Sequence, residues 1–284
     1  MKRMDVLGRS SGENMNGLYL YCIRDKTEDP SSFHTGGIDR KGEVFTIIHD
    51  ELEAVVSRVS LSEFTSDEIR KKAQEDLYWI KEKAVIHEDV IEEAMKGTAG
   101  FVSVIPMGFG IIFKDKTRLK ETLDRNQTEM KETLDKVRGK QEWSAKIYLM
   151  DRERFESIVR EKNEEITLKE KEMASMPEGM AFFMEEELKE TVCNEVNKEL
   201  DAVLDNLFGK IGEDATESAR TKLLHREMTG KAEEMVFNAA FLVCADMVNL
   251  FTKALEDMAG NLTEKGLRLE YSGPWPPFNF TNGV

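Results

Sequence analysis

EWSAKIYL, residues 142–149, decides how the second half of the chain is interpreted. The stretch follows Gly139 and alternates in the manner of a β-strand. A helix is predicted from about Asp151, and MASMPEG (173–179) interrupts it before a long helix begins near Met180. Apolar residues recur along this long helix at steps of three and four, opposite a strongly acidic face. They are Ala181, Met184, Leu188, Val192, Val196, Leu200, Val203, Leu207 and Ile211.

The remaining segments complete a βαββαβ order. Residues 219–228 and 232–244 are predicted to be paired strands around Thr229-Gly230, although the second stretch also fits a helix. Residues 245–262 are predicted to be a helix, and LRLEY (267–271) a closing strand. This order is typical of the split βαβ, ferredoxin-like arrangement. We therefore predict a modified ferredoxin-like domain at 140–284.

The first half predicts an α+β domain at 17–139, after a disordered leader at 1–16. GLYLYCI (17–23) alternates as a strand with two usable faces, and 43–59 reads as a hairpin turning at HDE. One helix is expected to begin at Ser66 and to end before Gly97, and another from Lys116 to Arg138. The apolar run 101–113 between them is broken by Pro106, Gly108 and Gly110. The stripe expected on the first helix is Ile69, Ala73, Leu77, Ile80, Ala84, His87, Ile91 and Ala94.

Composition excludes several classes of protein. The 284 residues carry a formal net charge of −15, which would repel both nucleic acid and anionic membrane surfaces. No run of 18 apolar residues exists to span a bilayer, and the N-terminal residues lack the apolar stretch of a signal peptide. Cys22, Cys193 and Cys244 lie far apart in apolar segments, which favours buried thiols in a reducing cytoplasm.

No catalytic or cofactor pattern emerges from the residues. The four histidines fall in different elements without metal-ligand spacing, and the glycine-containing stretches match no phosphate-binding motif. His87 lies on the apolar stripe beside Glu88. A structural histidine is the preferred interpretation, with a catalytic His87–Glu88 pair as the alternative. We therefore predict no enzymatic activity, no cofactor and no bound metal.

The C-terminal tail GPWPPF (273–278) contains three of the six prolines. Because proline lacks a backbone donor and fixes φ, we expect an extended, stiff tail that is neither helix nor central strand. Trp275 is predicted to be largely buried on its own chain near the domain junction. In that arrangement Trp275 and Phe278 fill a groove, whereas the alternative is a tail that docks on a partner.

Eight segments are informative when they are considered as an ordered set: LYLYCI, LEAVVSRV, VIHEDVIEEAM, VIPMGFGIIF, EWSAKIYL, PEGMAFF, MVFNAAFLV and LRLEYSGPWPPFNF. Their order resembles that of the gas vesicle protein GvpL/GvpF family, from about Gly17 to Phe280. The terminal GPWPPF and the VIPMGFGIIF strand are the most specific. In two places the chain departs from the family pattern: Gly108 stands where the family's LPLRFGTVF strand has arginine, and Ser144 where it has glycine. A role that depends on that arginine is not expected here.

The resemblance implies an accessory protein of gas vesicle assembly with two α+β domains, found in the cytoplasm and at the gas vesicle. Such a protein would bind the hydrophobic shell protein, limit its aggregation during nucleation like a chaperone, and remain as a minor vesicle component. The shell protein and other gas vesicle accessory proteins are the expected partners. A small-ligand-binding regulatory module on a ferredoxin-like scaffold is the alternative. Candidate structural or interaction residues are His87, Pro106, Phe109, Gly110, Asn238, Trp275, Pro276, Pro277 and Phe278.

Overall fold

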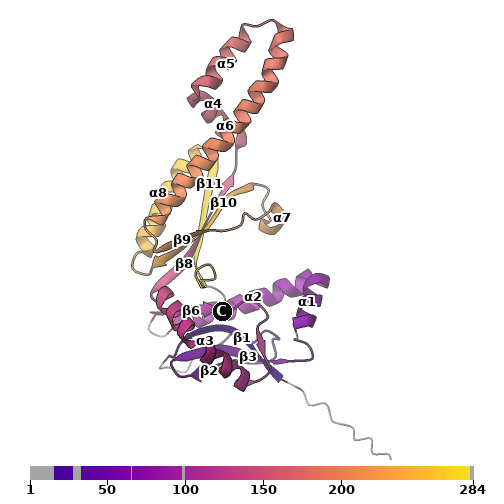
Figure 1. The fold of residues 1–284 in the computed structure, drawn as a ribbon, viewed down its shortest axis with the longest axis vertical. Helices are drawn as coiled ribbons and strands as arrows, with labels where there is room; N and C mark the ends of the chain where they lie inside the picture. The colour runs from indigo at the N-terminus through magenta and orange to yellow at the C-terminus, as the bar shows by residue number, and fades with distance from the viewer. Residues whose placement is uncertain (1–15, 28–32, 65, 98–99, 282–284) are drawn as a thin grey trace, which may run out of the picture. The chain divides into compact units, whose positions relative to one another are not determined.

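The computed structural model describes residues 16–27, 33–64, 66–97 and 100–281. Contacts between Cα atoms divide the chain into two units. The first unit comprises residues 1–139 together with 276–284, and the second comprises residues 140–275. The leader predicted at 1–16 lies outside the described residues except for Asn16. Each unit has its own antiparallel sheet, so the α+β class predicted from the sequence is confirmed (Figure 1).

The sheet of the first unit is built around its first strand. The strand order is β2-β3-β1-β6, β7 also pairs with β1, and β4 and β5 form a separate two-stranded ladder. The bounds are β1 Asn16–Asp25, β2 Val44–His49, β3 Leu52–Ser60, β4 Lys96–Gly97, β5 Gly100–Phe101, β6 Val104–Pro106 and β7 Ile112–Phe113. The hairpin predicted at 43–59 is confirmed, since β2 and β3 pair across the two-residue turn Asp50-Glu51.

Helices cover both faces of this sheet. The helices are α1 Ser66–Glu75, α2 Leu77–Ala94 and α3 Lys116–Val137. Side chains of β1 point alternately to the two faces, so Tyr19 and Tyr21 pack with the α2 side while Leu18 and Leu20 pack with the α3 side. The two usable faces predicted for β1 are thus both buried. The apolar face expected on α3 is also confirmed: Leu119, Leu123, Met130, Leu134 and Val137 are all buried.

The single helix predicted to run from Ser66 to just before Gly97 is in fact two helices. The carboxylate of Asp76 accepts hydrogen bonds from the backbone N–H groups of Tyr78 and Trp79, and so caps a new helix at Leu77. The break changes the phase of the buried face. Leu77 is 69% exposed and Ala84 is also exposed, contrary to the predicted stripe. The buried face of α2 is Lys83, Ile86, His87, Val90, Ile91 and Ala94.

The second unit has the sheet order β11-β8-β10-β9, with all neighbours antiparallel. Its strands are β8 Lys140–Leu149, β9 Glu217–Arg220, β10 Glu234–Cys244 and β11 Leu267–Trp275. Its helices are α4 Arg152–Lys162, α5 Glu164–Ala174, α6 Glu178–Gly212, α7 Arg226–Thr229 and α8 Val248–Glu264. Apart from the short α7, the order of strands and helical segments along the chain is the predicted βαββαβ.

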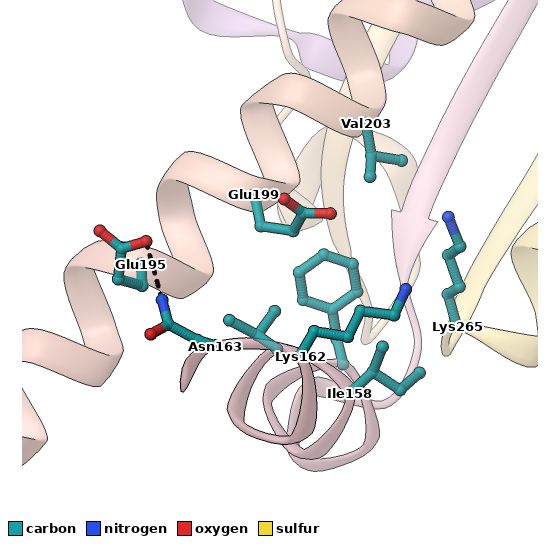
Figure 2. A pocket seen from close by; sticks show the side chains of 9 residues that line it. Ile158, Lys162, Asn163, Glu195, Glu199, Val203 and Lys265 are labelled. Carbon is teal, nitrogen blue, oxygen red and sulfur yellow. Dashed lines mark hydrogen bonds between the residues drawn. The ribbon is translucent and has the colours of Figure 1, made fainter. Parts of the chain in front are cut away.

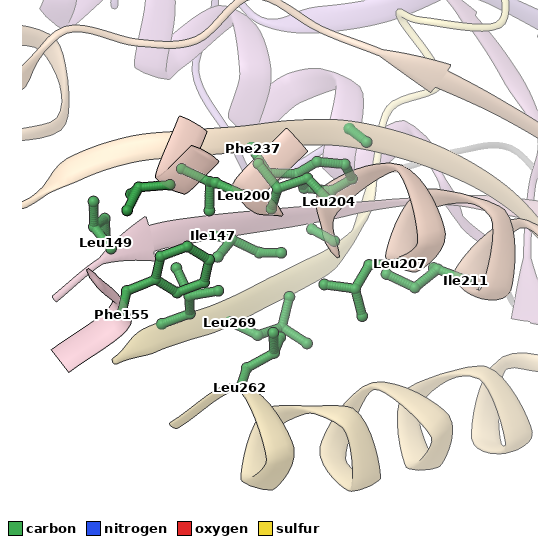
Figure 3. Packing of buried hydrophobic residues seen from close by; sticks show 14 of the residues in the cluster. Ile147, Leu149, Phe155, Leu200, Leu204, Leu207, Ile211, Phe237, Leu262 and Leu269 are labelled. Atoms are coloured by element: carbon green, nitrogen blue, oxygen red, sulfur yellow. The ribbon is translucent and has the colours of Figure 1, made fainter. Parts of the chain in front are cut away.

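One face of this sheet forms the core of the second unit. Figure 3 shows Ile147 and Leu149 of β8 beside Leu200 and Leu204 of α6. Since strand side chains alternate, Phe237, Ala239, Phe241 and Val243 of β10 all contribute to this core. Burying each of the larger side chains stabilises the fold by about 1.5–3 kcal/mol relative to exposure. The amphipathic pattern of α6 therefore determines which side of the sheet the helix covers.

Three further predictions in the second unit need correction. The strand predicted at 219–228 is only Glu217–Arg220, because the chain leaves the sheet at Thr221 and forms α7 at Arg226–Thr229. Of the three cysteines predicted to be buried, only Cys22 is; Cys193 is exposed, since it lies outside the apolar stripe of α6, and Cys244 is half-buried. The apolar stripe predicted for α6 omits Leu204, which is buried.

Candidate functional site

His87 is the centre of a hydrogen-bonded aromatic cluster in the first unit. Its Nε2 lies 3.0 Å from the Met107 carbonyl oxygen and its Nδ1 lies 3.0 Å from the Tyr19 hydroxyl. Because a carbonyl can only accept, Nε2 carries the proton, and Nδ1 accepts from Tyr19. The Tyr19 oxygen in turn accepts from the backbone N–H of Gly110 at 3.0 Å. Three elements, β1, α2 and the 107–110 segment, are therefore joined through one imidazole.

Aromatic rings also pack directly against the imidazole of His87. The Tyr21 ring stacks on the imidazole at 5.6 Å between centroids, and the Phe109 ring meets it edge-on at 5.8 Å. The Tyr21 hydroxyl lies 2.8 Å from the Ser57 hydroxyl and accepts from the backbone N–H of Ile38. All the polar atoms of this cluster named here have a partner, as burial requires.

Burial sets the charge state of the cluster. It lowers the pKa of His87 from 6.5 to about 4, although the hydrogen bond to the Met107 carbonyl acts in the opposite direction. Burial also raises the pKa of Tyr21 to about 12 and raises that of Tyr19. At neutral pH the three rings are uncharged, and both imidazole nitrogens are occupied by protein groups. The arrangement suits a clamp between elements better than proton transfer to a substrate.

The structure brings together three of the predicted candidates, His87, Phe109 and Gly110. Pro106 lies next to them in β6, where it pairs with Cys22 of β1. Sequence reasoning missed the tyrosine partners. Their signal is the i, i+2 spacing of Tyr19 and Tyr21 on one face of an apolar strand, because two buried hydroxyl groups need partners.

A buried ion pair in the same unit was also missed. Arg24 and Glu53 are joined at 2.9 Å between Nε and Oε2, and both side chains are almost fully buried. The Arg24 guanidinium also donates to the Ala94 carbonyl at 2.7 Å, at the C-terminal end of α2, where a cation complements the helix dipole. The pair connects β1, β3 and α2, so removing one partner would leave a buried charge uncompensated.

The C-terminal segment differs from its prediction in which residues are buried. β11 continues through Pro274 to Trp275 as an edge strand of the second unit, where a proline is tolerated. Trp275 is only half-buried, with its indole N–H donating to the Ser272 hydroxyl at 3.0 Å. Phe278 is 43% exposed. The prediction that these two aromatics are the buried anchors is therefore wrong.

The anchors of the segment are other residues. Pro276, Pro277, Phe280 and Thr281 are buried, and residues 276–284 group with the first unit. The Lys136 ammonium group donates to the Phe280 carbonyl at 3.0 Å and lies 6.0 Å from the centre of its ring. Backbone bonds from Phe280 and Thr281 to the Pro277 carbonyl form turns, so the tail is not extended beyond Trp275. A proline pair before a turn, followed by an aromatic residue, is the signal that could have found Phe280.

Asn238, the remaining candidate, lies on β10 and holds the segment after β9. Its side-chain amide donates to the Lys222 carbonyl at 2.8 Å, and its backbone carbonyl accepts from Thr221. These bonds fix the chain where it leaves the sheet before α7. The structure does not bring Asn238 into contact with another predicted candidate.

Two adjoining pockets lie on the helical side of the second unit. The first has a volume of about 140 Å³ and the second about 520 Å³. Figure 2 shows Glu199 and Val203 of α6 facing Ile158 and Lys162 of α4 across the first pocket. The Asn163 amide donates to Glu195 at 3.2 Å on the rim. The pockets share three lining residues, Glu199, Val203 and Lys265, and thus form one groove with an apolar floor and a rim of both charges.

One group of side chains among the residues that the structure describes could approach a metal ion. Ligand atoms of His49, Asp50 and Asp124 lie within 4.8 Å of one another in the first unit. His49 Nε2 is already 2.5 Å from an Asp124 oxygen, and Asp50 accepts from Gln127. Both aspartates are exposed, where such pairs are common without a metal. The expectation that the protein binds no metal stays a prediction.

The fold and these contacts define a two-unit α+β protein in which His87 and Arg24 form hydrogen bonds between different helices, strands and loops. Among the described residues, no helix is long and apolar enough to cross a membrane. The sequence model of "Gas vesicle synthesis protein GvpL/GvpF" matches residues 17–282. The chain therefore belongs to the GvpL/GvpF family of gas vesicle synthesis proteins, and the resemblance noted in the sequence is confirmed.

Similar proteins agree with this assignment over nearly their whole length. The chain is 24% identical to gas vesicle protein F of Nostoc sp. (strain PCC 7120), over 93% of this chain and 98% of that protein. It is also 24% identical to gas vesicle protein L1 of Halobacterium salinarum, over 95% and 92% respectively. The crystal structure of GvpF from Anabaena sp. PCC7120 superimposes with a TM-score of 0.71, at 21% identity, covering 94% of this chain and 98% of that one. GvpF from Microcystis aeruginosa superimposes with a TM-score of 0.65, at 20% identity, over 94% and 99%.

The two departures from the family pattern occupy different environments. A Cβ atom built on Gly108 would meet nothing within 4 Å, so the position has space for a side chain. Ser144 lies half-buried on β8, paired with Ser272 of β11 and Ala240 of β10. Gly108 is itself exposed, so a side chain at this position would begin in open space.

Proposed function

We propose that this protein is an accessory factor of gas vesicle assembly that binds the hydrophobic shell protein and limits its aggregation during nucleation. The observation that carries the proposal is the family match over residues 17–282. The protein would act in the cytoplasm and at the gas vesicle, where it remains as a minor component. Its partners would be the shell protein and other accessory proteins, without nucleic acid or membrane, and it would catalyse no reaction.

Charge and surface chemistry support this activity. A subunit of a gas-facing wall exposes apolar surface before it assembles, and such surface associates without selectivity. The net charge of −15 would keep complexes of the accessory protein apart in solution. The second unit meanwhile offers exposed Leu168 and Met180 for apolar contact. Methionine is suited to such contacts because its side chain adapts its shape to a partner.

We also propose that the second unit is a modified ferredoxin-like fold. Its strand order β11-β8-β10-β9 and its βαββαβ chain order support that assignment. In this interpretation the α4, α5 and α6 helices replace the first crossover helix. The crossover is therefore enlarged into three helices, which provide surface beyond what the sheet needs.

Aggregation of the shell protein tests the proposed function directly. A gas vesicle shell protein is refolded from denaturant with and without the purified accessory protein, and pelleted material is measured. We expect the accessory protein to keep the shell protein in the supernatant, whereas an unrelated protein of similar size and charge does not. Equal pelleting in both samples, together with normal vesicle formation in cells that lack the gene, would overturn the proposal.

The groove of the second unit favours one alternative, a small-ligand-binding regulatory module. Its larger pocket, of about 520 Å³, falls in the range of ligand sites, about 300–1,000 Å³. The rim, however, mixes both charges without converging polar groups. Thermal unfolding in the presence of a metabolite panel separates the two functions, since a regulatory ligand would raise the unfolding temperature.

A further inference from the structure

The sheet of the first unit has an open edge at β2. This strand pairs only with β3 and ends the strand order β2-β3-β1-β6. Within the part of the chain that the structure describes, no turn, loop or side chain forms a hydrogen bond with the backbone of residues 44–49. Because backbone groups along a strand point alternately to its two sides, half of the N–H and C=O groups of β2 point away from β3. They are a row of groups that another strand could bind.

The other edges of the two larger sheets have features that discourage strand addition. At the far end of the same sheet, β6 and β7 are only three and two residues long. In the second unit, β9 is four residues long with Glu217 and Arg220 at its ends, and β11 contains Arg268, Glu270 and Pro274. Short strands, charged side chains and proline all protect an exposed edge. β2 has none of these features, since its six residues VFTIIH include no proline, lysine or carboxylate.

The side chains of β2 are divided between the two faces of the sheet. Val44 is buried in the cluster on the α2 side, and Ile47 is buried in the cluster on the α3 side. Ile48 is 47% exposed, although isoleucine is among the residues most often buried. The exposed apolar surface of the strand therefore lies along its open edge.

β2 is complementary to a second copy of itself. A two-fold axis perpendicular to the sheet makes the two β2 strands antiparallel and keeps equivalent faces on the same side. With the axis at Thr46, Thr46 lies opposite its own counterpart, Val44 lies opposite Ile48, and Phe45 lies opposite Ile47. Every central pair is then either apolar or a threonine pair, and both kinds stabilise antiparallel strands.

The residues beside the strand favour this register over a shifted one. In the register centred on Thr46, the carboxylate of Glu43 lies opposite the imidazole of His49 of the second copy. A register centred on Ile47 instead places Glu43 opposite Glu51, and like charges that face each other are destabilising. A one-residue shift of the axis is thus disfavoured by charge.

We propose that two copies of this chain pair through β2, in the register centred on Thr46, and join their sheets into one. The occupant is a second copy because the strand is complementary to itself along its whole length. The paired edge is about 20 Å long, so the dimer is a weak and reversible one. The inference goes beyond the proposed function, since a dimer would present two surfaces for shell protein and bind two linked subunits more tightly than one.

Sedimentation velocity of the full-length protein tests the dimer. The chain has a mass of 32.5 kDa, and we expect the average mass to rise towards twice that value between about 1 and 200 µM protein. Ile48→Lys places a cation at an exposed position of the open edge, as natural edge strands do. This substitution should weaken dimerisation at least tenfold without unfolding the first unit.

Paired charge variants test the register. Thr46→Lys or Thr46→Glu alone places like charges opposite each other at the two-fold axis, so each variant should be monomeric. An equal mixture of the two variants should recover the dimer, because lysine then lies opposite glutamate. Val85→Lys and Val85→Glu are the matched controls, at a position on α2 that is 56% exposed. Both controls should dimerise as the unchanged protein does, and circular dichroism confirms that every variant is folded.

Several results would overturn the inference. An unchanged protein that stays monomeric at every concentration would exclude the dimer, even if its β2 edge binds an extended apolar peptide. Dimers that Thr46→Lys leaves intact would place the interface elsewhere, and folded Thr46 variants that remain monomeric when mixed would exclude the register. The shell protein assay separates the two proposals. Protection by monomeric Thr46→Lys would leave the proposed function standing without the dimer, whereas a dimer that gives no protection would contradict only the proposed function.

Discussion

Replacing His87 tests whether the aromatic cluster stabilises the first unit. His87→Gln removes the only titratable group of the cluster with a pKa near 4 and keeps an amide that can partly replace its hydrogen bonds. We expect two effects. The free energy of unfolding should fall by about 1–3 kcal/mol at neutral pH, because ring packing is lost and the Tyr19–Met107 connection is weakened. The pH dependence of unfolding should also become shallower.

The size of the pH effect follows from the displaced pKa. In the folded protein the pKa of His87 is about 4, compared with 6.5 when unfolded. The unfolded chain therefore binds more protons between these values, so stability is present at neutral pH and is lost as pH falls from about 6.5 towards about 4. Between pH ~7.5 and pH ~5 the loss attributable to His87 is about 2 kcal/mol. A histidine with a raised pKa would give the opposite sign.

Urea unfolding at the two pH values measures this loss. The difference between the two free energies is compared for the unchanged protein and for His87→Gln, so that carboxylates common to both cancel. His225→Gln is the matched control, because His225 is exposed and outside the cluster. If the unchanged protein and His87→Gln lose equal stability on acidification, burial of a neutral His87 is not what links the cluster to pH. Normal stability with complete loss of vesicle assembly would instead assign His87 a direct functional role.

Three further substitutions test local features of the two units. Asp76→Ala should lower the free energy of unfolding of the first unit by about 1 kcal/mol in urea titrations, because it uncaps α2, and an unchanged midpoint would contradict this. Gly266→Ala should lower the melting temperature and reduce the free energy of unfolding by more than about 1 kcal/mol, since Gly266 has φ +77° and an added Cβ would lie 2.6 Å from the Asp151 carbonyl oxygen. Gly260→Ala on α8 is the control, because an added Cβ there would meet no atom within 4 Å. In calorimetry, Phe280→Ala should lower the free energy of unfolding of the first unit by about 3 kcal/mol, whereas Phe278→Ala should lower it by about 0.5 kcal/mol or less. Equal effects of the two substitutions would contradict the assignment of Phe280 as the anchor.

Features of the fold that depend on local periodicity could be predicted from the sequence. The buried stripe of α3 and the β2–β3 hairpin follow from repeats of three to four residues and of two residues, which short-range sterics impose. The predicted helix 66–96 shows the limit of that reasoning. Leu77 and Ala84 continue an apolar period across Asp76, but the carboxylate of Asp76 caps a new helix, and the stripe changes face.

The residues that form the His87 cluster were harder to predict from the sequence than the fold. His87, Phe109 and Gly110 could be singled out, yet their partner Tyr19 lies 68 residues from His87 in the chain. No local pattern encodes such a pairing. The C-terminal aromatics illustrate the same limit, because the burial of Phe280 depends on the turn at Pro277 and on Lys136, which is 144 residues away in the chain.

The first unit is discontinuous in the sequence, and this has a consequence for its synthesis. Residues 276–281 group with a unit whose other residues precede position 140. A ribosome must make the whole second unit, which takes on the order of 10 s, before Phe280 can reach Lys136. A nascent chain stalled within α6 or α8 therefore holds a first unit without its closing segment. Completion of the first unit therefore occurs only in chains that already contain the second.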